Sequence, residues 1–322
     1  MKLFIRHIII LFIVLFVSYF ICLIIYTNGI LKNKSSNVKN LTSEGFCLQR
    51  FRDIEKYKNI DFLFLGPSHT YRGFDTRIFS ENNITSFNMG SSNQSPVNTY
   101  YLLKTYINKI HPKTIIFEIS SETLEIDGNE SSIDLISNLP FSWDLIKMGF
   151  SSKNNLITVN SIFSIFLNRI CHSFKNEMQK AVKDNKYIEG GFVEFTGNST
   201  YSNIINNPVI NPHKSNIENY QLKYLKMIIE LIKSNKINLI LVSTPITAEY
   251  KHSIINYNEI KSKIMSIASE ENVKYIDFND AEYFNKMNLK TDKHFFDYTH
   301  LNKEGTGIFN RFFIWMISNN YY

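Results

Sequence analysis

The chain has 322 residues, of which 44 % are hydrophobic and 14 % aromatic, and its formal net charge at pH 7 is +6. This composition excludes a disordered chain and suffices for one large α/β domain or two small ones. The charge is mild for this length and scattered, which excludes the concentrated basic face of a nucleic-acid-binding protein. We therefore expect no nucleic-acid partner.

Residues 8–26, IIILFIVLFVSYFICLIIY, are apolar and carry no charge. A helix of this length spans about 30 Å, which is the thickness of the hydrocarbon core of a bilayer. Bulky residues at the carboxyl end of the segment disfavour a cleavable signal peptide, and basic residues flank it on both sides. We predict an uncleaved membrane anchor over residues 1–30, with the globular part extracytoplasmic. A buried core helix is the alternative.

Residues 31–58 are polar and lysine-bearing, which predicts a juxtamembrane spacer that leads into a short helix. Apolar runs of strand length follow, each ending near a turn-forming residue. They occupy residues 60–66, 84–90, 113–120, 237–245 and 273–279. Because these runs are continuously apolar rather than alternating, they predict strands that are covered on both faces, as in a parallel sheet.

Helical patterns lie between these runs, at residues 95–110, 219–235 and 257–272. Alternating strands and helices predict a doubly wound α/β sheet with right-handed crossovers, within a domain over residues 59–322. The long gap at about 121–218 is too long for a structureless loop, so we predict an inserted helical subdomain there. It contains a helical run at 161–183 and the segment GGFVEF at 190–195, which forms either a cleft wall or a simple tight turn.

The three cysteines form no paired framework. Cys22 falls inside the apolar segment. Cys47 and Cys171 either form one disulfide in an oxidising compartment or are two unrelated thiols.

Three of the predicted strand ends carry polar chemistry. The sequence GPSH at 66–69 places Ser68 at a strand-to-helix turn, where it needs a base within hydrogen-bond reach to act as a nucleophile. The sequence NMGSSNQSP at 88–96 contains Gly90, whose N–H can approach a reacting carbonyl closely because glycine has no Cβ. In HFFDYTHLNKEG, at 294–305, Asp297 and His300 are spaced so that the carboxylate can orient the imidazole.

The blocks GPSH, NMGSSNQSP and DYTHLNKEG, in this order, resemble the SGNH/GDSL hydrolase superfamily. The match is nearest to a membrane-anchored branch that includes the alginate O-acetylation proteins and the D-alanine-transfer protein of teichoic acid synthesis. The resemblance covers about residues 60–315 and implies a flavodoxin-like, three-layer α/β/α fold with a five-stranded parallel sheet. It also implies that Ser68 is the nucleophile, His300 the base and Asp297 its orienting residue, with the N–H groups of Ser68 and Gly90 as oxyanion donors.

The chain departs from the family pattern in two places. Pro67 stands where the better-known members have aspartate before the serine, and the segment FEISSETLE after the third strand lacks the usual asparagine. Asn93 or Ser120 are the candidates to replace that oxyanion donor, or the hole has backbone donors only.

Other polar residues near the blocks have simpler interpretations. We expect His69 to be a surface histidine at a helix start, and Glu118 to line the cleft or to form a salt bridge. His294, together with Asp297 and His300, has a loose metal-ligand spacing as an alternative, but we expect no metal and no cofactor.

These residues lead to two hypotheses for function. In the first, the chain is a membrane-anchored serine esterase or O-acyltransferase that acts on acyl esters of a cell-surface glycan. Its partners are then the bilayer, an acylated glycan or acyl donor, and a multi-span membrane acyltransferase. In the second, the chain is a non-catalytic protein of the same fold that binds or assembles an envelope polysaccharide.

Overall fold

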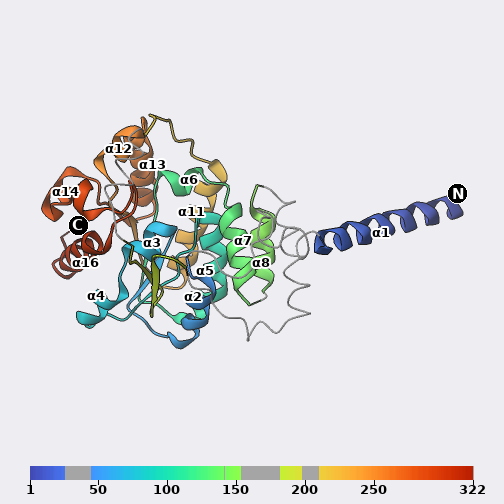
Figure 1. The fold of residues 1–322 in the computed structure, drawn as a ribbon, viewed down its shortest axis with the longest axis horizontal. Coiled ribbons are helices and arrows are strands. Elements are labelled where there is room, and N and C mark those ends of the chain that lie inside the picture. The colour runs from blue at the N-terminus through green and yellow to red at the C-terminus, as the bar shows by residue number, and fades with distance from the viewer. Residues whose placement is uncertain (26–44, 141, 154–181, 198–209, 322) are drawn as a thin grey trace.

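The structure is a computed structural model that describes residues 1–25, 45–140, 142–153, 182–197 and 210–321. Helix α1 (Lys2–Ile25) extends away from the folded part of the chain (Figure 1). Its segment Lys2–Cys22 has a mean hydropathy of 2.5, and within the described residues it is the one helix long and apolar enough to cross a membrane. A signal sequence near the N-terminus has the same properties, so the anchor itself remains a prediction.

A five-stranded parallel sheet forms the centre of the folded part, and its strands have the order β2-β1-β3-β6-β7. The strands are β1 (Phe62–Leu65), β2 (Ser86–Asn88), β3 (Thr114–Glu118), β6 (Asn238–Ser243) and β7 (Lys274–Asp277). All five predicted strands are therefore confirmed, each somewhat shorter than its apolar run. The chain crosses from β1 to β2 on one side and then returns to β3 on the other, so the strand order reverses at β1. In sheets of this kind ligands bind at such a switch point, beyond the carboxyl ends of the strands.

Helices cover both faces of the sheet. The longer ones are α5 (Pro96–Ile110), α11 (Asn219–Ser234), α13 (Tyr257–Glu270) and α16 (Lys303–Ser318). The shorter ones are α2 (Cys47–Asp53), η2 (Ile54–Lys56), α3 (Ser68–Gly73), α4 (Thr76–Glu81), α6 (Ser121–Glu125), α7 (Asn129–Asn138), α8 (Trp143–Ser151), α12 (Ala248–Ser253), α14 (Ala281–Met287) and α15 (Thr291–His294). The helices predicted at 95–110, 219–235 and 257–272 are confirmed as α5, α11 and α13.

Neighbouring strand residues point to opposite faces and build two separate cores. On one face, Leu63 and Ile115 pack with α5, α11 and α13. On the other, Phe64 and Ile116 pack with α4, α14 and α16. The continuous apolar runs arise because both faces are covered, and the result is the expected three-layer α/β/α arrangement.

Helix α2 lies within the stretch that we predicted as a spacer. Its side chains Cys47 and Phe51, and Ile54 just after it, are buried in the core under α5. The structure therefore packs the second half of residues 31–58 against the sheet layer. Cys171 lies outside the described residues, so its pairing with Cys47 stays open.

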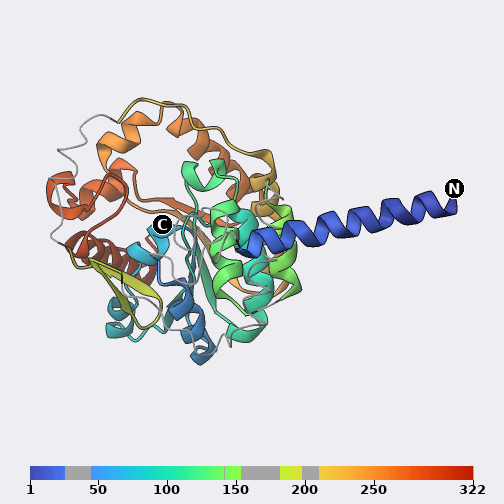
Figure 2. The same cartoon turned by 45° about the vertical axis from the view of Figure 1, so that its right-hand side comes forward.

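The predicted insertion contributes α6, α7 and α8 and, unexpectedly, an antiparallel hairpin of β4 (Asn185–Ile188) and β5 (Phe192–Phe195). The turn holds Gly190 and Gly191, both at positive φ, and the Asn88 N–H donates to the Gly190 carbonyl over 2.7 Å. The hairpin, yellow-green in Figure 2, thereby docks on the end of β2. The helical run predicted at 161–183 lies almost wholly outside the described residues.

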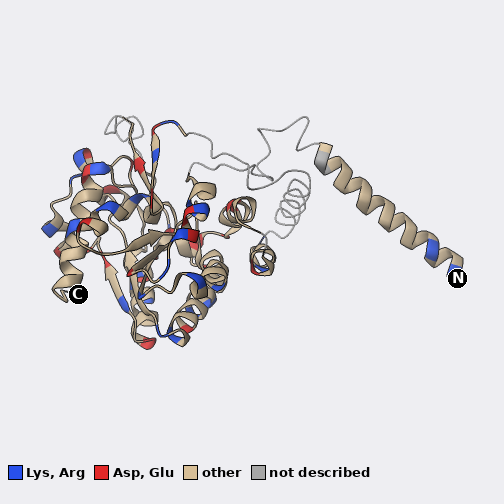
Figure 3. Ribbon diagram, turned by 90° about the horizontal axis from the view of Figure 1, so that it is seen from below, with Lys and Arg blue, Asp and Glu red and all other residues tan. Residues whose placement is uncertain are grey.

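Charged residues of both signs are interspersed over the folded part, as Figure 3 shows. Arg77 on α4, for example, pairs with Asp75 and with Glu194 of the hairpin, each over 2.7 Å.

Candidate active site

Ser68 is the first residue of α3 and follows a sharp turn at the end of β1. Gly66 has a φ of 138°, and a Cβ there would clash with the Thr70 hydroxyl and the Glu118 side chain. Only glycine fits this conformation at low cost. Pro67, the residue before α3, has an extended conformation. The turn thus places Ser68 at the carboxyl end of the sheet, beside the switch point.

His300 and Asp297 lie in the loop between α15 and α16. The His300 Nε2 atom is 2.7 Å from Ser68 Oγ, and its Nδ1 atom is 2.9 Å from Asp297 Oδ2 and 3.0 Å from Oδ1. The His300 side chain is 16 % exposed, so solvent still reaches the ring. The structure therefore brings together the three residues predicted from widely separated blocks, with the imidazole between hydroxyl and carboxylate.

The Asp297 carboxylate is held by its own loop. Besides the His300 ring, the backbone N–H groups of Thr299 and His300 donate to Oδ1 over 2.8 and 2.7 Å. Partial burial acts to raise the pKa of this carboxyl, but the His300 ring and these N–H groups outweigh it and hold the pKa below the ordinary range. An anionic Asp297 favours the tautomer with the proton on Nδ1, which leaves the Nε2 lone pair facing Ser68.

The two predicted backbone oxyanion donors differ in their surroundings. Within the described part of the chain, the Ser68 N–H has no hydrogen-bond acceptor, as is normal for the first residue of a helix. The Gly90 N–H instead donates to Asn88 Oδ1 over 3.1 Å. Gly90 belongs to the loop that follows β2, called the second loop below. A Cβ at Gly90 would lie 3.0 Å from the Gly66 carbonyl oxygen, so this loop passes close to the turn that carries Ser68.

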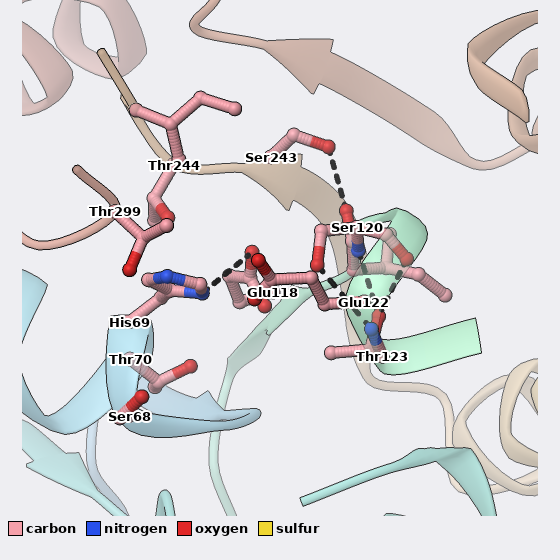
Figure 4. Close-up of polar contacts among 12 residues, drawn as sticks. Ser68, His69, Thr70, Glu118, Ser120, Glu122, Thr123, Ser243, Thr244 and Thr299 are labelled. Carbon is pink, nitrogen blue, oxygen red and sulfur yellow. Dashed lines mark hydrogen bonds and ion pairs between the residues drawn. The ribbon is translucent and has the colours of Figure 1, made fainter. Parts of the chain in front are cut away.

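The contacts of Asn93 do not support the prediction that it is an oxyanion donor. The residue is exposed, and its Nδ2 donates to Glu130 Oε2 over 2.6 Å. Ser120, the other candidate, caps α6 and accepts from the Thr123 N–H. Figure 4 shows Ser120 on the far side of Glu118 from Ser68, so the Ser120 side chain is not presented to the serine.

Asn88 and Arg50 support the second loop, and sequence reasoning missed both. Asn88 is fully buried; its Nδ2 donates to the Thr70 carbonyl over 2.7 Å while its Oδ1 accepts from Gly90. Arg50, also fully buried, donates from Nη1 to the Gly90 carbonyl over 2.8 Å and from Nε to the Gly191 carbonyl over 3.0 Å. A polar residue at the end of a buried strand was a usable signal for Asn88. Arg50 gave none, because its partners are remote in sequence.

We expect Arg50→Ala to lower the free energy of unfolding by about 3 kcal/mol or more, because it empties a buried site and leaves two carbonyls without a donor. Urea unfolding of the full chain in detergent measures the effect. The exposed Lys58→Ala is the control, for which we expect a change within about 0.5 kcal/mol. An Arg50→Ala protein as stable as the control would contradict the support role.

Comparisons with known proteins were made by sequence and by structure. Neither a scan against protein-family models nor a search of the curated proteins found a match. Among solved structures, a putative acylhydrolase from Bacteroides fragilis is similar at 12 % identity and a TM-score of 0.43, covering 87 % of this chain and 100 % of that one. The psychrotrophic esterase EstA from Pseudoalteromonas gives 11 % and 0.40, with 81 % and 98 % covered. A catalytic mutant of Axe2, an acetylxylan esterase from Geobacillus stearothermophilus, gives 12 % and 0.40, with 81 % and 95 % covered.

At these identities and TM-scores, the similarity does not indicate which chemistry this chain performs. The candidate site therefore stands on its own geometry.

A polar groove of about 740 Å³ lies beside the loop that carries His300. Its lining includes Arg77, Lys303 and Arg311 together with Phe195 of the hairpin. The Phe195 ring stacks on Phe296, with centroids 4.2 Å apart, and so joins the hairpin to the His300 loop. The groove is in the size range of ligand sites, and its walls come from the insertion and from the last helix.

His69 and Glu118 are buried beneath the site formed by Ser68, His300 and Asp297. The prediction of a surface histidine is wrong, since His69 is only 6 % exposed and Glu118 only 1 %. Burial lowers the pKa of His69 to about 4, with a further contribution from the nearby His300 ring. Burial, reinforced by the charge of Glu122, raises the pKa of Glu118 well above its usual range. His69 is therefore neutral at pH 7, and the burial of Glu118 favours its uncharged form.

The raised pKa of Glu118 gives a stability prediction with a definite sign. Unfolding exposes a carboxyl that ionises near its ordinary pKa of about 4.3, so wild-type stability falls as the pH rises from there through the folded pKa. Glu118→Gln keeps a neutral polar group and removes this loss. We expect its free energy of unfolding, relative to wild type, to increase with pH across that window. Urea unfolding measured at several pH values checks this, and a pH-independent difference would contradict it.

Proposed function

We propose that this chain is a serine enzyme of the SGNH/GDSL type that transfers acyl groups from esters, either to water or to a hydroxyl of a glycan. The observation that supports this most is the imidazole of His300, which has Ser68 Oγ at 2.7 Å on one nitrogen and the Asp297 carboxylate at 2.9 Å on the other. This is the arrangement that activates a serine hydroxyl on unrelated folds.

In the first half of the proposed reaction, Ser68 Oγ attacks the ester carbonyl while its proton passes to His300 Nε2. The tetrahedral oxyanion accepts from the open Ser68 N–H, and the Gly90 N–H is shared between Asn88 and the oxyanion as a three-centre bond. Collapse breaks the ester C–O bond, and His300 returns the proton to the leaving alkoxide. An acyl-serine and a free alcohol result.

In the second half, water or a sugar hydroxyl attacks the acyl-serine. His300 takes the proton of the attacking group and then gives it to Ser68 Oγ as the acyl–serine bond breaks. Hydrolysis and transfer thus share the same residues and differ only in the acceptor that reaches the site. The groove is the proposed place for that acceptor, because it is polar and its lining includes Asn302, at the end of the loop that carries His300.

We further propose that α1 anchors the protein in a membrane with the folded part outside the cytoplasm, and that the substrate is an acyl ester of a cell-surface glycan. The length and apolarity of α1 support the anchor. The block resemblance supports the glycan and a multi-span membrane acyltransferase as the supplier of acyl groups.

One observation favours a second candidate, a non-catalytic glycan-binding or assembly protein of the same fold. The Gly90 N–H already has an acceptor in Asn88, and Asn93 is bonded to Glu130, so of the predicted oxyanion donors the Ser68 N–H alone has no acceptor within the described residues. Loss of a single donor costs about 10² to 10³ in rate.

Labelling by a fluorophosphonate probe tests the enzyme against the binder. We expect the full chain in detergent to be labelled, the adduct to map to the Ser68 peptide, and the label to be absent in Ser68→Ala. Ser92→Ala, which removes a hydroxyl from the second loop, is the control that should label normally. Absence of labelling in a wild-type protein that unfolds cooperatively would overturn the proposal in favour of the binder.

A further inference from the structure

His69 lies directly beneath the His300 ring and belongs to no interaction used above. Its ring centroid is 4.7 Å from that of His300, with the two planes inclined by 33°. On its other side, Nδ1 is 4.0 Å from Glu118 Oε1, as the dashed line in Figure 4 marks. Figure 4 shows His69 between Thr299 above and Ser68 below, with Glu118 beside the ring. The histidine thus separates the reacting groups from a buried acid.

This pair is polar and buried without matching hydrogen bonds. Among the described residues, neither ring nitrogen of His69 has a hydrogen-bond partner, nor has Glu118 Oε2. An arrangement of this kind costs free energy, so packing elsewhere must compensate for it. Such a cost is typical of functional sites rather than of cores. A cavity of about 20 Å³ borders both residues and leaves them room to adjust their separation.

We propose, building on the enzymatic function proposed above, that His69 is a positioning residue for His300: its neutral ring packs against the imidazole and holds Nε2 towards Ser68 Oγ. Phe296 lies on the same imidazole at a centroid distance of 5.9 Å, so the ring is restrained by two aromatic neighbours. Restraint of this kind matters because a misplacement of about 1 Å can reduce a rate about 10²-fold.

The neutrality of His69 is part of the proposal. When His300 takes the Ser68 proton it becomes a cation, and a charged ring 4.7 Å away would oppose that step. The neighbouring Glu118 carboxyl is buried, and its raised pKa favours the uncharged form, so it does not introduce a net charge beside His69. His69 and Glu118 therefore place polar side chains that favour their uncharged forms beneath the His300 imidazole.

The experiment compares His69→Ala and His69→Phe in the full chain in detergent, with the exposed His252→Ala as the control. The readouts are kcat and KM on p-nitrophenyl acetate, and the downfield NMR resonance of the proton between His300 Nδ1 and Asp297. We expect His69→Ala to lower kcat about 10- to 100-fold with KM nearly unchanged and to broaden the resonance. His69→Phe restores an uncharged ring, so kcat should recover to within about threefold of wild type.

Unchanged kcat in His69→Ala would overturn the inference, as would a folded His69→Phe protein that is as slow as His69→Ala. If His69→Ala does not fold, the decision rests on His69→Phe and on Glu118→Gln, which keeps a neutral hydrogen-bonding group and should retain wild-type kcat. A Glu118→Gln protein as slow as Ser68→Ala would also overturn it. Failure of the proposed function is distinguishable, because wild type itself would then show no turnover while the resonance still reports on the ring.

Discussion

Ser68→Ala should reduce kcat on p-nitrophenyl acetate by about 10³-fold or more, with little change in KM. The hydroxyl is the proposed nucleophile and sits 2.7 Å from His300 Nε2, so its removal leaves the imidazole without a group to activate. The proposed acceptor groove is lined by other residues, so we expect substrate binding there to be unaffected. Steady-state kinetics of the full chain in detergent measures both parameters.

The control for this prediction is Ser92→Ala, whose hydroxyl donates to Glu130 in the first turn of α7. We expect it to keep wild-type kinetics. The enzymatic proposal fails if Ser68→Ala and Ser92→Ala show the same turnover above background.

Asp297→Asn should lower kcat about 10³- to 10⁴-fold while leaving the fold intact. The amide has nearly the shape of the carboxylate but lacks its charge, so it no longer favours the tautomer with the proton on Nδ1. The Nε2 lone pair that faces Ser68 is then lost in part of the molecules. Kinetics, together with the NMR resonance of the His300 Nδ1 proton, measure the change.

The same substitution should also change how the free energy of unfolding depends on pH. Because the folded pKa of Asp297 lies below its ordinary value of about 3.9, wild type gains stability above that value and loses it as the pH falls through the folded pKa. The difference in free energy of unfolding between Asp297→Asn and wild type should therefore shrink as the pH falls. An Asp297→Asn enzyme with wild-type kcat would show that the carboxylate does not orient the base.

The sheet could be predicted because its information is local. Strands buried on both faces must be continuously apolar, and each run ends where a turn residue such as Gly66 begins the next element. The meeting of Ser68 with Asp297 and His300 followed from the order of the blocks and from the rule that parallel strands present their carboxyl ends at one edge.

The rest of the site depends on contacts between remote segments, which leave no periodic pattern. Arg50 resembles any basic residue in a polar stretch, yet it is buried because two carbonyls from distant loops converge on it. His69 follows the serine at a helix start, where exposure is the usual expectation, but Glu118 and the His300 loop enclose it. The insertion hairpin was missed for a related reason, since its docking partner Asn88 lies about a hundred residues earlier.

The burial of α2 has a practical consequence for the design of shortened chains that lack α1. Because the buried Arg50 donates to the Gly90 carbonyl, a truncation that removes residues 45–58 would remove this support from the loop that carries Gly90. Soluble versions should begin ahead of Gly45. Inactivity of a shorter fragment would then reflect the loss of support for the Gly90 loop and would not count against an enzymatic function.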